Sequence, residues 1–228
     1  MIDLHSHILP QMDDGSKSTE ETEKLLQMLK AQGVTELAAT PHFYAHRERP
    51  EDFLRRREEA LSRMPETDLP LHIGAEVAYF PGMQNCEDLI SLQLGSTRLL
   101  LVEMPFRPWT DRMAADICAI PIHLGLTPVL AHIDRYRGGS QFPKYFQQLL
   151  ESDVLFQCNA DAFEKLLSRS WALKQLKHGL IHFLGSDSHN LTTRAPRLEL
   201  AANSIRKKLG PEFFADFTDF SRQLLHQE

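Results

Sequence analysis

Seven short apolar runs recur along the chain, and each is followed by a longer segment with helical patterning. The runs are IDLH (2–5), TELAATPH (35–42), LHIGAEVAY (71–79), RLLLVEMPF (98–106), TPVLAHIDR (127–135), DVLFQCNA (153–160) and IHFLGSDSH (181–189). Nearly continuous apolar stretches of this kind are typical of strands buried on both faces of a parallel sheet. The alternation therefore predicts a single α/β domain over residues 1–228.

The segments between the runs predict helices. Leu25, Leu26 and Leu29 follow the i, i+3, i+4 pattern, and Ser18 opens their segment as a capping residue. The expected helices cover residues 18–31, 51–64, 86–93, 110–124, 142–152, 161–178, 193–209 and 211–226. Seven parallel strands could form an open doubly wound sheet or a closed, imperfect barrel. No glycine-rich fingerprint follows the first run, which disfavours a dinucleotide-binding sheet.

The charge balance and the cysteines restrict the classes of partner and compartment. The net charge of −6 and the isoelectric point of about 6.0 argue against nucleic acid as the main partner. Cys86, Cys118 and Cys158 are widely spaced and form no C-x-x-C pair, as expected for buried thiols in a reducing compartment. No signal peptide opens the sequence, and no apolar run approaches the ~20 residues of a membrane span. We expect a cytoplasmic protein without membrane insertion, and homo-oligomerisation stays open.

Histidines and carboxylates collect at the carboxyl ends of the expected strands. In chain order these residues are His5 and His7, His42, Glu76, Glu103, His132, and Asp187 with His189, whereas the sixth run offers only Asn159 and Asp161. In an α/β barrel, the carboxyl ends of the strands form the face that carries the active site. Ionised carboxylates buried there without partners would cost several kcal/mol each, whereas divalent cations would compensate them. The strand ends therefore favour a barrel with a metal site.

The candidate ligands are nitrogen and oxygen donors without a thiolate. Asp14, in the DDG that follows His7, completes a set of five imidazoles and four carboxylates: His5, His7, Asp14, His42, Glu76, Glu103, His132, Asp187 and His189. Nine ligands are too many for one ion and enough for two or three that share carboxylates. This donor set suits Mn²⁺, Fe²⁺ or Zn²⁺. Such clusters commonly activate water and hold a phosphoryl group.

Two arginines are expected on loops at the same face. Arg135 follows His132 by three residues, and Arg194 follows His189 by five. A guanidinium group suits bidentate contact with phosphate oxygens, so both are candidate phosphate ligands. His46 lies in a basic loop after His42 and is a weaker candidate for contact with phosphate or peptide.

Several motifs together resemble the PHP (polymerase and histidinol phosphatase) superfamily. They are H-S-H-x-L-P-x-x-D-D-G, A-T-P-H, G-x-E, the glutamate before Met-Pro-Phe, A-H-x-x-R-Y and G-S-D-S-H-N. More narrowly, they resemble the manganese-dependent tyrosine-protein phosphatases of bacterial capsule and exopolysaccharide loci. The match covers nearly the whole chain, in order and at similar spacing.

The resemblance implies a distorted (β/α)₇ barrel with a trinuclear metal site. Mn(II) is the favoured ion, and Fe and Zn are the alternatives. All nine candidate ligands carry over by motif, with Glu76 as a bridging carboxylate, Asp13 as a rival to Asp14, and Arg135 and Arg194 as phosphate ligands. The implied substrate is the phosphotyrosine-rich tail of a bacterial tyrosine kinase. Hydrolysis would proceed by attack of a metal-bridging hydroxide on phosphorus, and His42 or a bound water would protonate the leaving group.

The sequence departs from the family pattern without losing a proposed ligand. Gln11 stands where glycine is common, Phe43 where a second histidine is frequent, and Ile133 and Ser188 also differ. Phe43 and Ile133 could reshape the mouth of the pocket, which bears on the substrate more than on the activity.

Other functions stay open to different degrees. A small-molecule phosphatase of the same superfamily, such as a histidinol-phosphate phosphatase, is the nearest alternative. A phosphodiesterase or a non-catalytic metal-binding scaffold is less favoured. A cysteine-dependent tyrosine phosphatase is excluded, because it needs an arginine six residues after the thiolate. The residues at that distance from the three cysteines are Leu92, Leu124 and Glu164.

Overall fold

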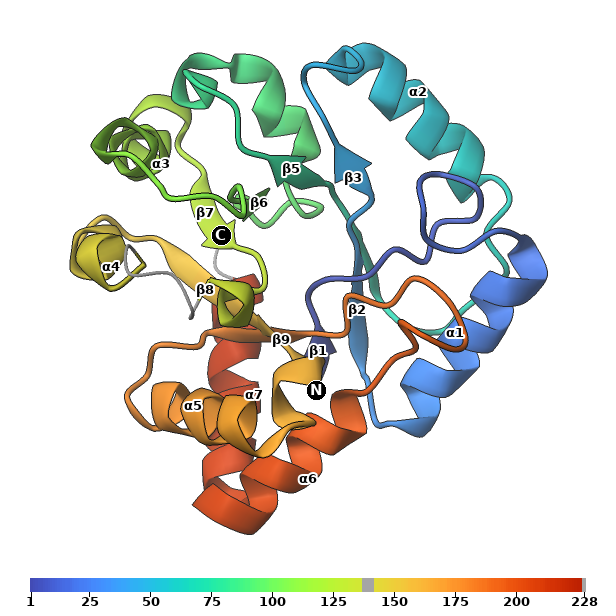
Figure 1. Ribbon diagram of the computed structural model, residues 1–228. Helices are drawn as coiled ribbons and strands as arrows, with labels where there is room; N and C mark the ends of the chain where they lie inside the picture. Colours follow the sequence, from blue (N-terminus) through green and yellow to red (C-terminus); the bar gives the residue numbers. More distant parts are fainter. Residues whose placement is uncertain (137–141, 227–228) are drawn as a thin grey trace.

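The computed structural model describes residues 1–136 and 142–226 (Figure 1). The strands of these residues all pair in parallel. They are β1 (Ile2–Asp3), β2 (Glu36–Ala39), β3 (His42–Phe43), β4 (Leu71–Ile73), β5 (Glu76–Ala78), β6 (Leu99–Glu103), β7 (Thr127–Leu130), β8 (Leu155–Asn159) and β9 (Phe183–Gly185).

The strands form a ring with the predicted seven positions, because β3 continues β2 and β5 continues β4. β2 pairs with β1 and β4, while β3 opens the hydrogen-bonded order β3-β5-β6-β7-β8-β9. Backbone hydrogen bonds from Leu4 N to Leu184 O (3.1 Å) and from Asp187 N to His5 O (2.7 Å) join the last position to the first. The prediction of a distorted (β/α)₇ barrel is confirmed.

Two strand positions are interrupted where the sequence breaks the ladder. Pro41 has no N–H to donate between β2 and β3. Gly74 lies between β4 and β5, where a Cβ atom would come within 2.4 Å of Leu94 Cδ2. Beyond these interruptions, β3 and β5 begin in register with His42 opposite Glu76. This register brings two of the candidate ligands side by side.

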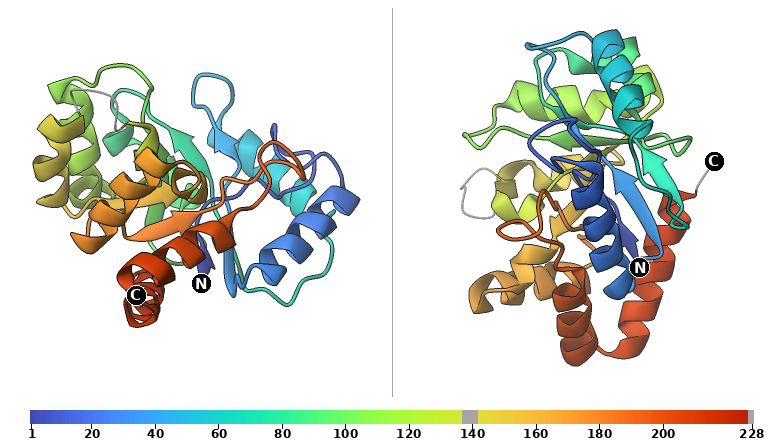
Figure 2. Two further views of the ribbon diagram at one scale, coloured as in Figure 1. Left: turned by 60° about the horizontal axis from the view of Figure 1, so that its bottom comes forward. Right: turned by 90° about the vertical axis from the view of Figure 1, so that its right-hand side faces the viewer.

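Helices surround the strands (Figures 1 and 2). They are α1 (Thr19–Ala31), α2 (Pro50–Leu61), α3 (Asp111–Leu124), α4 (Phe142–Leu150), α5 (Leu166–Lys177), α6 (Leu198–Leu209) and α7 (Pro211–Leu225). Ser18 caps α1 as expected, since its hydroxyl accepts a hydrogen bond from Glu21 N (3.2 Å). No helix in the described residues is long and apolar enough to cross a membrane.

Three predicted helices differ in the structure. In place of the helix 86–93, Glu87–Leu92 forms a 3₁₀ segment, and the extended Cys86 separates it from another 3₁₀ segment, Met83–Asn85. The segment 161–178 is divided at Lys165, also extended, into a 3₁₀ turn (Ala160–Phe163) and α5. The helix expected from residue 193 begins at Leu198, because the Asn190 side chain holds the preceding loop, accepting a hydrogen bond from Arg194 N (3.0 Å).

The buried apolar residues form an outer and an inner cluster. The alternation along β6 places Leu100 and Val102 in the outer cluster, against the helices, and Leu99 and Leu101 in the inner one. The same alternation directs Glu103, at the carboxyl end of β6, toward the inside. Leu225 of α7 closes the inner cluster, and α7 packs near β1 and the N-terminus (Figure 2). The interior is therefore apolar toward the amino ends of the strands and polar at their carboxyl ends.

Candidate metal centre

The structure brings the nine predicted ligands together at the carboxyl ends of the strands. Three sets of ligand atoms each lie within 4.8 Å of one another: His5, His7 and Asp187; His42, Glu76 and Glu103; and His7, Asp14, His42 and His189. His132 joins the second set, because its Nε2 lies 3.0 Å from Glu76 and 3.3 Å from Glu103 Oε1. The three sets share His7 and His42, so they form one continuous centre.

Glu76 lies in the middle of this centre. Its Oε2 is 2.8 Å from His42 Nδ1, 3.3 Å from His5 Nε2 and 3.4 Å from His7 Nε2. Its Oε1 faces His132 instead. The residue is 1% exposed, so its two oxygens are screened from water and face imidazoles on both sides. This is the geometry needed for a carboxylate that bridges two cations.

Asp13 and Asp14 face different parts of the site. Asp13 accepts hydrogen bonds from His7 Nδ1 (2.7 Å), His42 N (2.9 Å) and Gly15 N (2.9 Å). Asp14 Oδ1 instead lies 3.5 Å from the Nε2 atoms of both His42 and His189. Asp14 is thus arranged to ligate a cation, whereas Asp13 orients His7 so that Nε2 points into the centre.

Several buried polar atoms of the centre have no hydrogen-bond partner among the described residues. They are His42 Nδ1, Glu76 Oε2, His132 Nδ1 and His189 Nε2. Buried polar groups without partners are costly and rare, and here three of the four point toward neighbouring donors and acceptors of the cluster. Nitrogen and oxygen atoms in this state fit divalent cations such as Mn²⁺, Fe²⁺ or Zn²⁺.

The electrostatics of the protein alone also fit a cation site. Burial by itself lowers the pKa of His7, but the carboxylates of Asp13 and Glu76 raise it more, to about 10. Burial would raise the pKa of Asp187, but the charges of His5, His7 and Arg135 hold it well below its usual range. In the absence of metal, protons on His7 and His132, whose pKa values the neighbouring carboxylates raise, therefore offset part of the negative charge. Cation binding would displace these protons.

A layer of amides and hydroxyls lies behind the ligands and was not predicted. Gln157 Oε1 faces His5 Nδ1 (3.2 Å) and accepts a hydrogen bond from His132 N (2.7 Å). Asn159 Nδ2 donates a hydrogen bond to Asp187 Oδ2 (2.9 Å). The sixth apolar run, which forms β8, therefore supports a candidate ligand although it supplies none. The only sequence signal was that both amides lie in an otherwise apolar run, DVLFQCNA.

Two of the ligands have backbone conformations that are unusual for their residue types. His132 has φ 35° and Asp187 has φ 50°, both in the left-handed region. Residues other than glycine adopt this region at a cost, and such residues concentrate at functional sites. The hydrogen bonds from His132 N to Gln157 and from Asp187 N to His5 O hold these conformations.

Arg135 and Arg194 reach the centre from the loops after β7 and β9. Both form an ion pair with Asp187, and the Arg194 Nη2 atom lies 2.7 Å from Asp187 Oδ1. About one third of each arginine side chain is exposed, and Arg194 Nη1 also lies 4.0 Å from Asp14 Oδ2. They are placed to contact an anion bound over the cluster.

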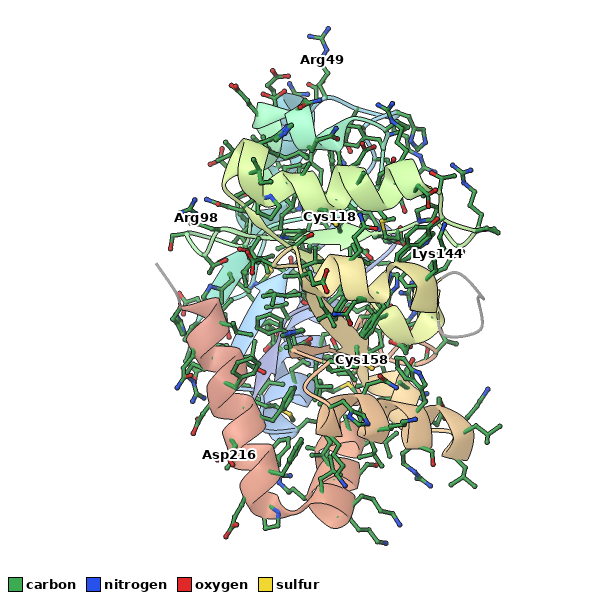
Figure 3. The ribbon with its side chains drawn as sticks, turned by 90° about the vertical axis from the view of Figure 1, so that its left-hand side faces the viewer. Arg49, Arg98, Cys118, Lys144, Cys158 and Asp216 are labelled. Carbon is green, nitrogen blue, oxygen red and sulfur yellow. The ribbon has the colours of Figure 1, made fainter. Side chains whose placement is uncertain are left out.

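The other histidines and the cysteines lie outside the ligand sets of the described residues. His46 lies near Tyr44, with ring centroids 5.8 Å apart, and lines a pocket whose wall also includes the candidate ligand Glu103. His72 and His226 form a separate group with Glu36. Cys118 lies on α3 and Cys158 on β8 (Figure 3), outside the ligand sets of the described residues.

Comparisons with known proteins identify one family over nearly the whole chain. A family model described as "Capsular polysaccharide synthesis, CpsB/CapC" matches residues 1–225. The chain is 31% identical over 241 residues to the tyrosine-protein phosphatase CpsB of Streptococcus pneumoniae, covering 99% of this chain and 98% of that protein. It is 28% identical over 238 residues to the tyrosine-protein phosphatase YwqE of Bacillus subtilis (strain 168), covering 100% of this chain and 92% of that protein.

Solved structures are similar to this chain as well. One of them comes from work on YwqE of Bacillus subtilis and CpsB of Streptococcus pneumoniae, described as unique metal-dependent tyrosine phosphatases. Its TM-score is 0.79, and its sequence is 25% identical. It covers 99% of this chain and 94% of that chain. The histidinol phosphate phosphatase of Lactococcus lactis subsp. lactis Il1403 has a TM-score of 0.52 and 15% identity, with 90% and 92% covered, and shares the fold.

Proposed function

The chain belongs to the CpsB/CapC family of capsular polysaccharide synthesis, and from this we propose that it is a metal-dependent tyrosine-protein phosphatase. The observation that carries the proposal is the buried Glu76 carboxylate, surrounded by imidazoles on both oxygens, with two arginines over the same face. This combination can bind cations and a phosphoryl group at one place.

We propose that all nine clustered residues are ligands and that they hold two or three Mn(II) ions. The three ligand sets support this number, because each offers three or four donor atoms and Glu76 can be shared. Asp14 is proposed as a ligand in preference to Asp13, because its Oδ1 lies beside the Nε2 atoms of His42 and His189, whereas Asp13 faces the Nδ1 atom of His7, on the other side of that ring from Nε2. Fe or Zn would suit the same donors.

The protein's own residues would position the phosphate ester. When bound, the ions would supply a water of lowered pKa as nucleophile and neutralise charge on phosphorus. Arg135 and Arg194 would hold the phosphoryl oxygens through the N–H groups that do not face Asp187. Asp187 holds both guanidinium groups in place before the substrate binds. The two groups therefore need little reorientation when negative charge develops on the phosphoryl oxygens.

His42 is the chain's own candidate for proton transfer to the leaving group. Its side chain is 15% exposed, whereas those of the other four clustered imidazoles are at most 2% exposed. A substrate tyrosine has a leaving-group pKa of roughly 10, so it needs little assistance. His42 can provide that assistance through the ring nitrogen that does not bind a cation.

The physiological substrate proposed is a phosphotyrosine protein, specifically the tail of a bacterial tyrosine kinase in polysaccharide synthesis. The relatives support the first part by being tyrosine-protein phosphatases, and the family description supports the link to capsular polysaccharide.

The decisive experiment compares hydrolysis of a phosphotyrosine peptide with hydrolysis of histidinol phosphate. We expect a higher kcat/KM for the peptide, complete loss of activity with EDTA, and restoration best by Mn²⁺. The His7→Ala variant should lose activity and bound metal, while His178→Ala, at an exposed position after α5, should behave as wild type. Normal turnover in His7→Ala would contradict the cluster mechanism, and a preference for histidinol phosphate would contradict the proposed substrate class.

A further inference from the structure

A pocket of about 260 Å³ opens beside the metal centre and is not used by the mechanism above. Its wall includes Tyr44, Tyr79, Phe80, Met104, Phe106 and the candidate ligand Glu103. Glu103 Oε1 lies 3.3 Å from His132 Nε2, so the pocket and the ligand cluster share a wall. A group bound in the pocket would therefore lie next to one bound at the ions.

Phe106 is the exposed aromatic residue of this wall. The residue is 64% exposed, whereas Tyr44, Tyr79 and Phe80 are partly buried. Its ring stacks near His132 (centroids 5.6 Å apart, 24° between planes) and near Tyr136 (5.6 Å, 28°). Packing on these two rings holds Phe106 at the edge of the centre and leaves its other side open.

Tyr44 separates this pocket from a second hollow of different character. The second hollow also borders the ligands, but it is lined by charged residues, including Asp13, Asp14, Arg47 and Arg56. An aromatic group would leave those charges poorly solvated. The wall around Phe106 is mostly aromatic and apolar, with one imidazole (His46) and one carboxylate (Glu103), and is the better match for a ring.

We propose that the pocket between Tyr44 and Phe106 binds the phenyl ring of the substrate phosphotyrosine. The inference rests on the proposed function and assigns the residues that select an aryl over an alkyl phosphate. The proposed function places the phosphoryl group between the ions and the two arginines that pair with Asp187. In phosphotyrosine, a single oxygen joins the ring to phosphorus. The ring must therefore occupy the space next to the cluster, and the Glu103 side offers an apolar wall. The volume lies just below the ≈ 300–1,000 Å³ of typical small-molecule pockets, which suits one side chain.

The test compares three substrates in wild type, Phe106→Ala, Phe106→Tyr and Ile122→Ala. The substrates are a phosphotyrosine peptide, phenyl phosphate and ethyl phosphate. Loss of ring stacking should lower kcat/KM of Phe106→Ala about tenfold for both aryl substrates and leave ethyl phosphate unchanged. Phe106→Tyr should retain the aryl preference, and Ile122→Ala, exposed on α3, should behave as wild type. Bound metal and inhibition by inorganic phosphate should be unchanged in all variants.

Two results would overturn the inference. An equal loss on aryl and alkyl substrates would mean that Phe106 only supports His132. A loss on the peptide but not on phenyl phosphate would mean that the pocket binds a neighbouring residue of the peptide. Failure of the wild-type protein to hydrolyse the phosphotyrosine peptide would instead contradict the proposed function itself, so the two failures are distinguishable.

Discussion

Asp13 and Asp14 are neighbours in the chain, yet their carboxylates have different surroundings. The Asp13 side chain is 9% exposed and fully engaged by donors, whereas that of Asp14 is 66% exposed and faces two imidazoles. Burial would raise the pKa of Asp13, but its contacts with His7 and two backbone N–H groups hold that pKa well below the usual range. A carboxylate saturated in this way is a support for a ligand, and its neighbour remains available to a cation.

Substitution of each aspartate by asparagine should separate these roles. Asp14→Asn should bind one cation fewer per chain at saturating Mn²⁺, because it weakens a first ligand of the His42–His189 set. Asp13→Asn should keep the full number but lower the affinity about 10- to 100-fold, the effect expected for a residue that orients a ligand. Elemental analysis after equilibrium dialysis measures both quantities. The reverse pattern would make Asp13 the ligand.

Gln157 is the buried amide that supports two ligands at once. In Gln157→Leu, His5 Nδ1 and the His132 N–H would both lose the oxygen that they face. We expect metal affinity or kcat/KM to fall about 10- to 100-fold, with a fold that still unfolds cooperatively. Gln147→Leu, an exposed glutamine on α4, is the matched control and should retain wild-type values. Wild-type affinity in Gln157→Leu would show that the ligands keep their orientation without it.

At the scale of elements, the sequence located the clustered histidines and carboxylates better than the residues that support them. Histidines and carboxylates at strand ends could be assigned to one face, because the carboxyl ends of parallel strands meet there. Gln157 and Asn159 could not, since a neutral amide inside a strand carries no comparable signal and its partners lie 25 or more residues away. The interruptions at Pro41 and Gly74 were likewise hidden in runs with the pattern of continuous strands, although His42 and Glu76 pair directly beyond them.

The last helix closes the end of the barrel opposite the metal centre. Leu225 of α7 is fully buried in the inner cluster with Leu4 and Phe183. Leu225→Ala should lower the free energy of unfolding by about 2–5 kcal/mol, because it removes apolar contacts and leaves a cavity. Leu224→Ala, at a half-buried position, should have a smaller effect. Urea unfolding measures the loss. Bound Mn²⁺ should stay at the wild-type number, and a loss of metal would contradict the separation of the two ends.

At the scale of the whole molecule, His182 links three elements that are far apart in the sequence. Its Nδ1 accepts a hydrogen bond from Phe156 N of β8 (3.0 Å), which requires an unprotonated nitrogen. Its backbone oxygen accepts a hydrogen bond from the Ser221 hydroxyl of α7 (2.7 Å), and Phe183 opens β9 directly after it. Burial lowers the pKa of His182 to about 4. Protonation of His182 therefore destabilises the folded protein where β8, β9 and α7 meet.

The contribution of His182 to the stability of the metal-free protein should fall as the pH falls from about 6.5 to about 4. In this window the unfolded chain, with a histidine pKa of roughly 6.5, binds a proton that the folded protein excludes at His182. The difference corresponds to about 3 kcal/mol across the window. In His182→Asn, the amide oxygen can accept the hydrogen bond from Phe156 N, and the side chain does not titrate. Between pH 6.5 and 4, the unfolding free energy of this variant should therefore fall by about 3 kcal/mol less than that of the wild type. Urea unfolding in EDTA measures both curves, which should run parallel above pH 7. Equal slopes below pH 6.5 would mean that His182 is protonated in the folded protein.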